Sequence, residues 1–361
     1  MSTKKPEVIV IGAGQAGLAA GHHLARRGVG FLILDAEAHV GDQWRRRWDS
    51  LRLFTPAKHS GLPGAAWQRP GSDRPGKDDT AAYLAGYAAR WQLPIRSACP
   101  VSHVSYDGAD FVVTTPDDQL RSPNLIVATG AATVPHIPDV ATDCAARIAQ
   151  LHSSGYRNPG SVPGARALVV GFGTSGAEIA LELAESGREV VLAGRPTPVI
   201  PGPLLAVAGD LWWLLLTRVF TRATPIGRRM APVATAHGAP LIGISPRLLR
   251  DAGVQRAGRL ETTIDGKPVV DGEPLDVDAI VWCTGFRGDF GWLDLAGLEF
   301  DERGYPIAPF GIPGDPPGLG FVGMPFQARL ASPLLGGVGE DAEHVVGTLL
   351  ATRPIRGAAP A

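Results

Sequence analysis

Two copies of one glycine-rich sequence constrain this chain more than any other feature. The first runs from Gly12 to Gly17 (GAGQAG) and the second from Gly171 to Gly176 (GFGTSG). Each follows a short apolar run and opens a stretch of helical composition that ends at a glycine. In such a strand–turn–helix unit the glycines allow a tight turn and close approach to a pyrophosphate, which the helix N-terminus stabilises. Two copies predict two dinucleotides bound by one polypeptide.

The fingerprint residues themselves are the first predicted contacts with these dinucleotides. They are Gly12, Gly14, Gln15, Ala16 and Gly17 in the first unit, and Gly171, Gly173, Thr174, Ser175 and Gly176 in the second.

The residue that follows the second strand of each unit indicates which dinucleotide binds there. In the first unit the apolar run at 31–34 ends at Asp35. A carboxylate there accepts hydrogen bonds from the ribose hydroxyls of an unphosphorylated adenosine, as in FAD or NAD. In the second unit the run at 190–193 leads to Arg195, and a guanidinium there pairs with a 2′-phosphate. The second unit is therefore predicted to bind NADP, the alternative being that Arg195 is a solvated surface arginine.

Composition indicates an ordinary soluble enzyme. The chain has 361 residues and a formal net charge of −1, which allows two or three domains and gives no sign of binding to nucleic acid or an anionic membrane. The apolar run near the start is too short for a secretory signal. The three cysteines are far apart, without a C-x-x-C, which favours reduced thiols in the cytoplasm and argues against a disulfide oxidoreductase. The histidine spacing predicts no metal site.

An apolar stretch at 204–220 has to be compared with a membrane span. It is short for a membrane span and is interrupted by Asp210, Thr217 and Arg218. We expect no integral membrane segment. The stretch is instead predicted to pack between the domains or to line the mouth of the substrate site.

The two halves of the chain repeat one pattern at domain scale. An apolar strand at 125–127 ends in Ala128-Thr129-Gly130, and another at 279–282 ends in Cys283-Thr284-Gly285. Asp-Gly turn signals precede both strands. This pattern predicts an α/β protein with two Rossmann-like dinucleotide-binding domains, the NADP domain inserted into the FAD domain. The expected limits are 1–158 and 285–361 for the FAD domain and 159–284 for the NADP domain.

Further segments give the chain a resemblance to a known family. They are the G-D-Q-W at 41–44 with D-S-L-R-L at 49–53, the two T-G strand ends, the H-S-S-G-Y at 152–156, and the glycine-rich segments at 320–323 and 334–339. With the two fingerprints, they resemble the flavin-containing monooxygenases, in particular short bacterial members and the plant YUCCA enzymes. The resemblance spans roughly residues 7 to 346.

The resemblance implies cofactors, chemistry and further contacts. FAD would bind the first unit and NADPH the second. Reduced FAD would react with O2 to a C4a-(hydro)peroxide, from which a small-molecule soft nucleophile, a sulfide or an amine, takes one oxygen atom. The further cofactor-binding residues implied are Gln43, Trp44, Val101, Ala128, Thr129, Gly130, Thr284, Gly285, Gly323 and Leu335.

The chain departs from the family pattern at several positions. Before His152 it has Ala146 and Ile148 where the family signature has Phe and Gly, and Tyr156 stands where the Baeyer–Villiger branch has Trp. Thr55 stands where well-studied members carry an asparagine near the flavin. His152 and Thr55 are catalytic candidates, and the alternative interpretation of His152 is packing or hydrogen bonding between domains.

Three functions remain open from the sequence. The leading one is the NADPH-dependent monooxygenase. The second is an NAD(P)H:flavin oxidoreductase or oxidase that oxygenates no substrate, and the third is a redox-sensing nucleotide-binding protein without turnover. The run Arg45–Arg47 is interpreted as solvated, with a phosphate or domain contact as the alternative. A homodimer is also left open.

Overall fold

The computed structural model describes residues 5–200, 202–236 and 240–352. Its first sheet has five parallel strands in the order β21-β7-β1-β2-β3. The strands are β1 (Val8–Ile11), β2 (Phe31–Leu34), β3 (Ile95–Arg96), β7 (Asn124–Val127) and β21 (Leu319–Phe321). The central strands read as continuous apolar runs because both faces of the sheet are covered. Since β21 comes from near the C-terminus, this unit is completed by both ends of the chain.

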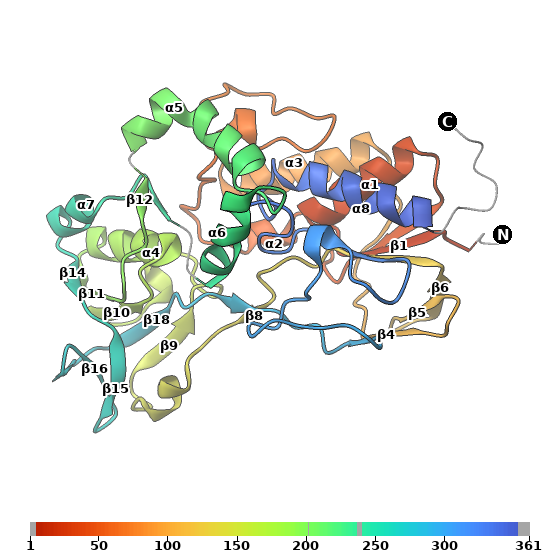
Figure 1. The fold of residues 1–361 in the computed structure, drawn as a ribbon. Helices are drawn as coiled ribbons and strands as arrows, with labels where there is room; N and C mark the ends of the chain where they lie inside the picture. Colours follow the sequence, from red (N-terminus) through yellow and green to blue (C-terminus); the bar gives the residue numbers. More distant parts are fainter. Residues whose placement is uncertain (1–4, 201, 237–239, 353–361) are drawn as a thin grey trace.

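Helices cover one face of the first sheet. They are α1 (Gln15–Arg26), α3 (Lys77–Arg90) and α8 (Val338–Thr352). Val8 and Val10 point to this face and pack with the apolar sides of the three helices in one core. The helices α1 and α8 lie side by side although they come from opposite ends of the chain (Figure 1).

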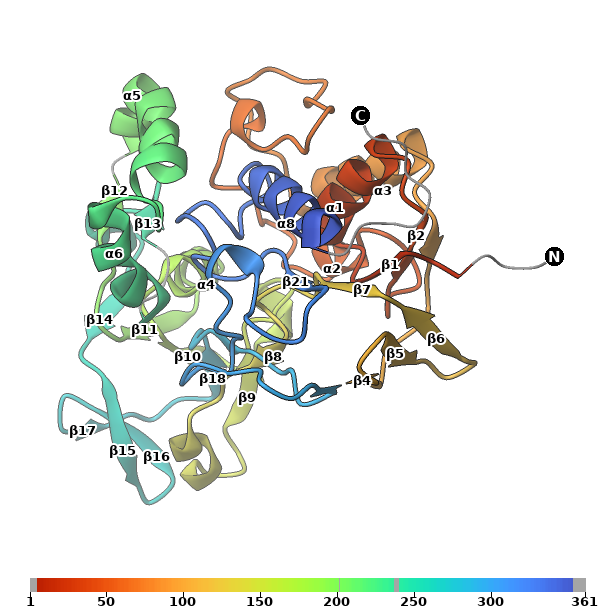
Figure 2. The same ribbon diagram turned by 45° about the vertical axis from the view of Figure 1, so that its right-hand side comes forward.

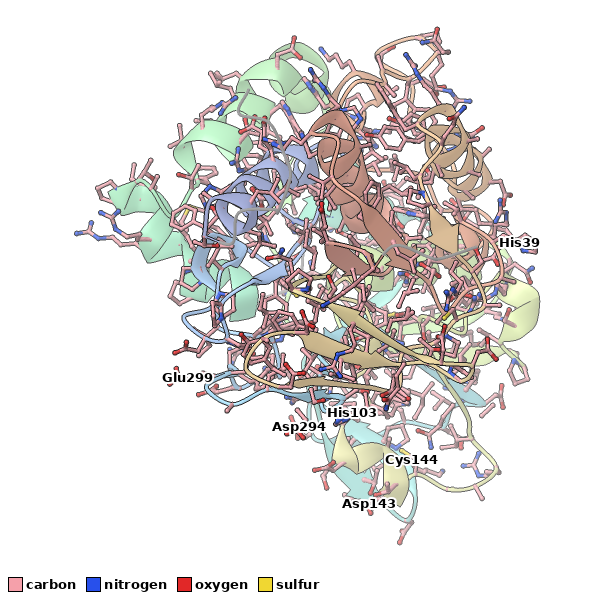
Figure 3. All side chains as sticks on the ribbon, turned by 90° about the vertical axis from the view of Figure 1, so that its right-hand side faces the viewer. His39, His103, Asp143, Cys144, Asp294 and Glu299 are labelled. Carbon is pink, nitrogen blue, oxygen red and sulfur yellow. The ribbon has the colours of Figure 1, made fainter. Side chains whose placement is uncertain are left out.

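Antiparallel strands cover the other face of the first sheet. They are β4 (His103–Tyr106), β5 (Phe111–Thr114) and β6 (Gln119–Ser122), with β20 (Leu293–Asp294) added in parallel beside β4. The β4–β5 connection carries the predicted Asp-Gly turn. His103 and Asp294 lie next to each other on neighbouring strands of this outer sheet (Figure 3).

The second sheet repeats the plan of the first. Its parallel order is β14-β11-β10-β18-β9. The strands are β9 (Ala149–His152), β10 (Arg166–Val170), β11 (Glu189–Ala193), β14 (Gln255–Ala257) and β18 (Ala279–Trp282). In each sheet the strand before the fingerprint is central, with the second strand on one side and the strand that ends in Thr-Gly on the other. The predicted fold class, two Rossmann-like units with one inserted into the other, is confirmed.

The strand β9 lies ahead of residue 159, the expected start of the NADP domain, and yet it pairs with β18 in the second sheet. The expected limits at 158 and 284 stay a prediction.

The second sheet is also covered on both faces. The helices α4 (Thr174–Glu185) and α7 (Pro246–Asp251) pack on one face. On the other lie the turn η2 (Asp139–Asp143) and a ribbon of β15 (Leu260–Ile264), β16 (Lys267–Val270) and β17 (Glu273–Pro274). Figure 2 shows this ribbon at the lower left, below the second sheet, and the β4–β6 strands at the lower right, below the first.

Two chain crossings join the units. The outgoing chain forms β8 (Val134–Pro135), the returning chain forms β19 (Phe286–Arg287), and the two pair antiparallel. They lie between the two sheets (Figure 1). Pairing of the crossings fixes how the second unit leaves and re-enters the first.

A helical excursion from the second unit reaches back over the first. It comprises α5 (Gly202–Leu214), the π-helical turn η4 (Leu215–Val219) and α6 (Pro225–Ala236). Trp213 of α5 stacks on His59 of the first unit, with ring centroids 5.1 Å apart. The stretch at 204–220 therefore includes a contact between the units, as predicted. Among the described residues, no helix is both long and apolar enough to cross a bilayer.

The remaining elements are short. They are α2 (Asp42–Arg45), η1 (Ala57–His59), η3 (Pro159–Ser161), β12 (Val199–Ile200), β13 (Leu241–Ile242) and η5 (Pro309–Gly311).

Candidate functional site

One elongated cavity of about 410 Å³ follows the carboxyl ends of the first sheet. The first fingerprint forms part of its wall, and the segments after β2 and β7 form much of the rest. The predicted contacts that line it are Gly12, Gly14, Gln15, Ala16, Asp35, Gln43, Trp44, Val101, Ala128, Thr129, Gly130 and Gly323. The structure thus brings together residues that are spread over most of the sequence.

The three fingerprint glycines of the first unit have different roles. Gly12 has φ +105°, and a Cβ there would lie 2.6 Å from the carbonyl oxygen of Ala128. A Cβ on Gly17 would overlap the Gly12 carbonyl oxygen, so Gly17 lets α1 pack closely on the turn. A Cβ on Gly14 would meet no protein atom within 4 Å and would enter the cavity instead. Of these three glycines, Gly14 is the one at which protein atoms leave room for a side chain, and that room belongs to the cavity.

The N-terminus of α1 is open to an anion. No side chain caps it, and its first turn holds no acidic residue. By contrast, α3 and α8 carry two acidic residues each in their first turns. Free N–H groups and the positive end of the helix dipole at the wall of a cavity suit a pyrophosphate.

Asp35, directly after β2, contacts the fingerprint turn. Its carboxylate accepts hydrogen bonds from the N–H groups of Ala13 and Glu37, the latter at 2.7 Å. Burial raises the pKa of the Asp35 carboxyl, and the hydrogen bond from Ala13 lowers it. Hydroxyl donors of a ribose would favour the ionised form further.

The cavity wall also holds an unsatisfied polar atom. The hydroxyl oxygen of Thr129 is buried and has no hydrogen-bond partner among the described residues. The neighbouring Gly130 has φ +81°, and a Cβ there would meet no atom within 4 Å. An unpaired hydroxyl beside open space fits a polar ligand in the cavity. Together with the bare Gly14 and the uncapped helix, these features fit a bound FAD.

Three predicted residues do not line this cavity. Gly17 lies behind the turn. Leu335 is 4% exposed and packs in the core between the first sheet and its helices. Thr55 bonds instead to Ser60, with 2.8 Å between their hydroxyl oxygens.

The second fingerprint has the backbone geometry of the first. Gly171 has φ +112°, and a Cβ there would overlap the carbonyl oxygen of Cys283, which takes the place of Ala128. A Cβ on Gly176 would overlap the Gly171 carbonyl oxygen. Gly173 precedes the first turn of α4, which contains Ser175 and has neither a capping side chain nor an acidic residue. The Thr174 hydroxyl donates to the carbonyl oxygen of Pro240 at 2.7 Å.

Two arginines flank the second fingerprint. Arg195 follows β11, is exposed, and has no ion-pair partner among the described residues. Arg256, on the neighbouring strand β14, lies over the ring of the fingerprint residue Phe172, 5.0 Å from its centroid. Both residues are available to a negatively charged group at this strand edge. No sequence motif indicates Arg256.

His152 is fully engaged in hydrogen bonds. Its Nε2–H donates to the carbonyl oxygen of Gly285 at 2.9 Å. Its Nδ1 lies 3.1 Å from the N–H of Ser154 and 2.9 Å from that residue's hydroxyl. Because a carbonyl oxygen only accepts, the proton is on Nε2, and burial lowers the pKa of the ring. His152 therefore joins β9 to the end of β18 and has no ring nitrogen left for acid–base catalysis.

The end of β18 is tied to the outgoing crossing. The Thr284 hydroxyl donates to the carbonyl oxygen of His136, and the N–H of His136 donates to the Gly285 carbonyl oxygen at 2.9 Å. These two predicted residues thus help to hold the junction of the two units.

Several cavity residues lie outside the predicted set. They include Leu84, Cys99, Pro100, Trp292, Pro333 and Arg47. Most of them belong to no sequence motif that would mark them as cofactor contacts. Arg47 belongs to the three-arginine run, and its place in the cavity agrees with the alternative to a solvated run.

The cysteines are unpaired. Cys99 lines the first cavity, and Cys283 lies beside the second fingerprint, where burial raises its pKa to about 12. Cys144 lies beside Asp143 at η2, far below His39 of the first cavity in the view of Figure 3. In the part of the chain that is described, no group of His, Cys, Asp and Glu is placed to hold a metal ion.

Comparisons with known proteins agree with this geometry. A family model described as pyridine nucleotide-disulphide oxidoreductase matches residues 9–201. An uncharacterized CzcO-like oxidoreductase of Geobacillus kaustophilus is 35% identical over 95% of this chain and 98% of its own length. The indole-3-pyruvate monooxygenase YUCCA1 of rice (Oryza sativa subsp. japonica) is 29% identical over 84% of this chain and 83% of its own. The solved flavin-containing monooxygenase of Stenotrophomonas maltophilia is 28% identical, covers 96% of this chain and 98% of its own, and superposes with a TM-score of 0.75.

Proposed function

The chain belongs to the pyridine nucleotide-disulphide oxidoreductase family, among its flavin-monooxygenase-like flavoproteins. We propose that it is an NADPH-dependent monooxygenase that acts on a small sulfide or amine. The observation that carries the proposal is the presence of two complete fingerprint turns in one chain, each with an uncapped helix behind it. The paired crossings β8 and β19 hold the two units together.

The first unit would hold FAD. The turn at Gly12–Gly14 and the N-terminus of α1 receive the pyrophosphate, and Asp35 accepts from the adenosine ribose. The Thr129 hydroxyl and the wall at Trp44 and Val101 face the rest of the cofactor. When bound, FAD would supply the redox chemistry between NADPH and O2.

The second unit would hold NADPH. The first turn of α4 receives its pyrophosphate, and Arg195 pairs with the 2′-phosphate. An exposed arginine without a carboxylate partner is free to make that contact. This assignment supports NADPH over NADH.

The protein would contribute positioning and exclusion of water rather than acid–base catalysis. His152 is committed to the Gly285 carbonyl oxygen, and the cavity wall includes the apolar side chains of Leu84, Val101 and Trp292. A soft nucleophile such as a sulfide needs no proton removed before it takes an oxygen atom. The overall reaction then converts sulfide, O2, NADPH and a proton into sulfoxide, water and NADP+.

A second candidate is an NADPH oxidase that releases hydrogen peroxide. Thr55 favours it, because its hydroxyl bonds to Ser60 and it is not among the residues that line the cavity. The chain thus offers no amide donor where the resemblance places one. The cysteines give no comparable support to disulfide reduction, since they are unpaired and form no C-x-x-C.

Isotope labelling separates these candidates. The FAD-loaded protein is incubated with NADPH, ¹⁸O2 and a simple thioether, and both sulfoxide and peroxide are measured. The proposal expects one ¹⁸O atom in the sulfoxide, with product formed in step with NADPH consumption. NADPH consumption matched by peroxide alone, with a panel of thioethers and amines left unlabelled, would establish the oxidase instead.

A further inference from the structure

Arg47 lies where the two units meet. Its side chain lines the cavity of the first unit. Its guanidinium carbon also lies 5.9 Å from the ring centroid of Phe286, which directly follows the Thr284-Gly285 end of β18. A first-unit residue therefore reaches the carboxyl edge of the second sheet.

The charge of Arg47 has no counterion in the protein. Among the described residues, no carboxylate lies within ion-pairing distance of it. Burial lowers the pKa of its guanidinium, and the nearby Arg157 lowers it further. Arg157 brings no acid with it, because its guanidinium donates to the carbonyl oxygens of Ser154 and Tyr156, at 2.8 and 3.0 Å.

The two preceding arginines both have carboxylate partners, so the missing counterion is specific to Arg47. Arg45 is exposed and donates to Asp42 at 2.7 Å. Arg46 is exposed and pairs with Glu37. Of three consecutive arginines, the half-buried one is the one without a carboxylate. Withdrawing a guanidinium from water without a counterion is costly, and an anion would offset that cost. The planar fork of the guanidinium matches phosphate oxygens.

The position of Arg47 favours an anion of the second dinucleotide. The pyrophosphate of FAD already has the Gly12–Gly14 turn and the N-terminus of α1. Arg47 instead lies near the ends of β18 and β9, where it also lowers the pKa of His152. β18 is the direct neighbour of β10, which leads into the second fingerprint. Dinucleotides lie along this edge of such sheets.

We propose that Arg47 binds the pyrophosphate of the nicotinamide dinucleotide, so that a side chain of the FAD unit completes the NADPH site. This inference rests on the proposed use of NADPH by the second unit. It makes NADPH binding depend on the two units being correctly placed relative to each other. The two arginines then contact different groups of NADPH: Arg195 binds the 2′-phosphate and Arg47 binds the pyrophosphate.

The test is equilibrium binding to the FAD-loaded protein without turnover. NADP+ is titrated calorimetrically into wild type, Arg47→Met, Arg47→Lys and the control Arg45→Met. Adenosine 2′-monophosphate, which lacks the pyrophosphate, is titrated into the same set. We expect Arg47→Met to weaken NADP+ about tenfold to a hundredfold, the loss of one charge-assisted contact. Arg47→Lys should lose less, and Arg45→Met should match wild type. Adenosine 2′-monophosphate should bind all four proteins alike.

Three outcomes would overturn the inference. NADP+ binding to Arg47→Met within twofold of wild type would show that Arg47 makes no contact with it. Loss of FAD without loss of NADP+ affinity would place the anion on the flavin cofactor. Equal weakening of NADP+ and adenosine 2′-monophosphate would mean a structural role. Because these titrations need no oxygenated product, failure of the monooxygenase proposal would be seen separately, in the labelling experiment.

Discussion

Gly14 and Gly17 belong to one six-residue turn, but a side chain would meet different things at each. At Gly14 it would enter the cavity, and at Gly17 it would meet the Gly12 carbonyl oxygen. Sequence alone gives both glycines the same motif. In the structure Gly14 borders open cavity space, whereas Gly17 allows α1 to pack closely on the turn.

Valine substitutions separate these two roles. Gly14→Val should give a folded protein that retains no FAD, because the new side chain occupies ligand space. Gly17→Val should lower the melting temperature strongly or prevent folding, because backbone must move. Gly86→Val, at another open glycine on the exposed side of α3, should keep both flavin and stability. Flavin absorbance and thermal melts of the three proteins check this, and a yellow Gly14→Val protein would contradict it.

Arg195 provides a prediction about cofactor choice. Loss of one charge-assisted hydrogen-bonded contact costs about 1.5–3 kcal/mol, so Arg195→Ala should weaken NADPH roughly tenfold to a hundredfold. NADH has no 2′-phosphate and should be nearly unaffected. Kd values for both cofactors in both proteins check this. Equal losses would make Arg195 a structural residue, and a wild type that already prefers NADH would refute the NADPH assignment itself.

At the scale of elements, α4 serves both the second fingerprint and the interface with the first unit. Its Glu182 accepts hydrogen bonds from Tyr156 at 3.0 Å and from Ser50 of the first unit at 3.2 Å. Trp48, also of the first unit, is 7% exposed and packs in the core of the second. The helix that offers its N-terminus to the dinucleotide is thus held by residues of both units.

Glu178, one turn before Glu182, makes this interface sensitive to pH. Burial raises its pKa to about 7, Arg74 of the first unit lowers it, and Glu182 raises it. The folded state therefore holds this proton more tightly than the unfolded chain does. The free energy of unfolding should fall as the pH rises from about 4.5 to about 7 and should remain lower above that range.

Glu178→Gln should remove the loss of stability that ionisation of Glu178 causes. At pH 8 the variant should be more stable than wild type by up to about 3 kcal/mol, and near pH 4.5 the two should differ little. Denaturant unfolding at both pH values measures this. Glu185→Gln, an exposed position at the end of the same helix, is the control and should change neither. A variant less stable than wild type at pH 8 would show that Glu178 is ionised and paired with Arg74.

Local features of this fold can be predicted from the sequence, whereas contacts between distant parts of the chain cannot. Signals within one strand–turn–helix stretch predict the fingerprint turns, the helices behind them and Asp35 at the end of the second strand. The structure has each of these features at the predicted place. The membership of β9 in the second sheet could not be found, because its Ala149–His152 sequence has no apolar run and its partner β18 begins at Ala279. Arg47 could not be separated from Arg45 and Arg46, since only tertiary structure buries one of three identical side chains. The side chain of Leu335 lies in the core, and its expected contact with the cofactor stays a prediction.

At the scale of the whole molecule, the insertion of one unit into the other brings two sites to one junction. The paired crossings β8 and β19, the His152–Gly285 hydrogen bond and the stacking of Trp213 on His59 all join the units. Arg47 lies over Phe286 at the same place. The proposed function requires such a junction, because NADPH bound to the second unit would have to reduce FAD bound to the first.

Anaerobic mixing of the FAD-loaded protein with NADPH tests whether the two sites serve one reaction. We expect one equivalent of NADPH to bleach the oxidised-flavin absorbance of the bound FAD, without any added reductase. At limiting concentration NADH should do so more slowly, and Arg195→Ala should slow NADPH toward the NADH rate. Flavin that stays oxidised in the presence of excess NADPH would contradict the account, because the two sites would then not serve one reaction.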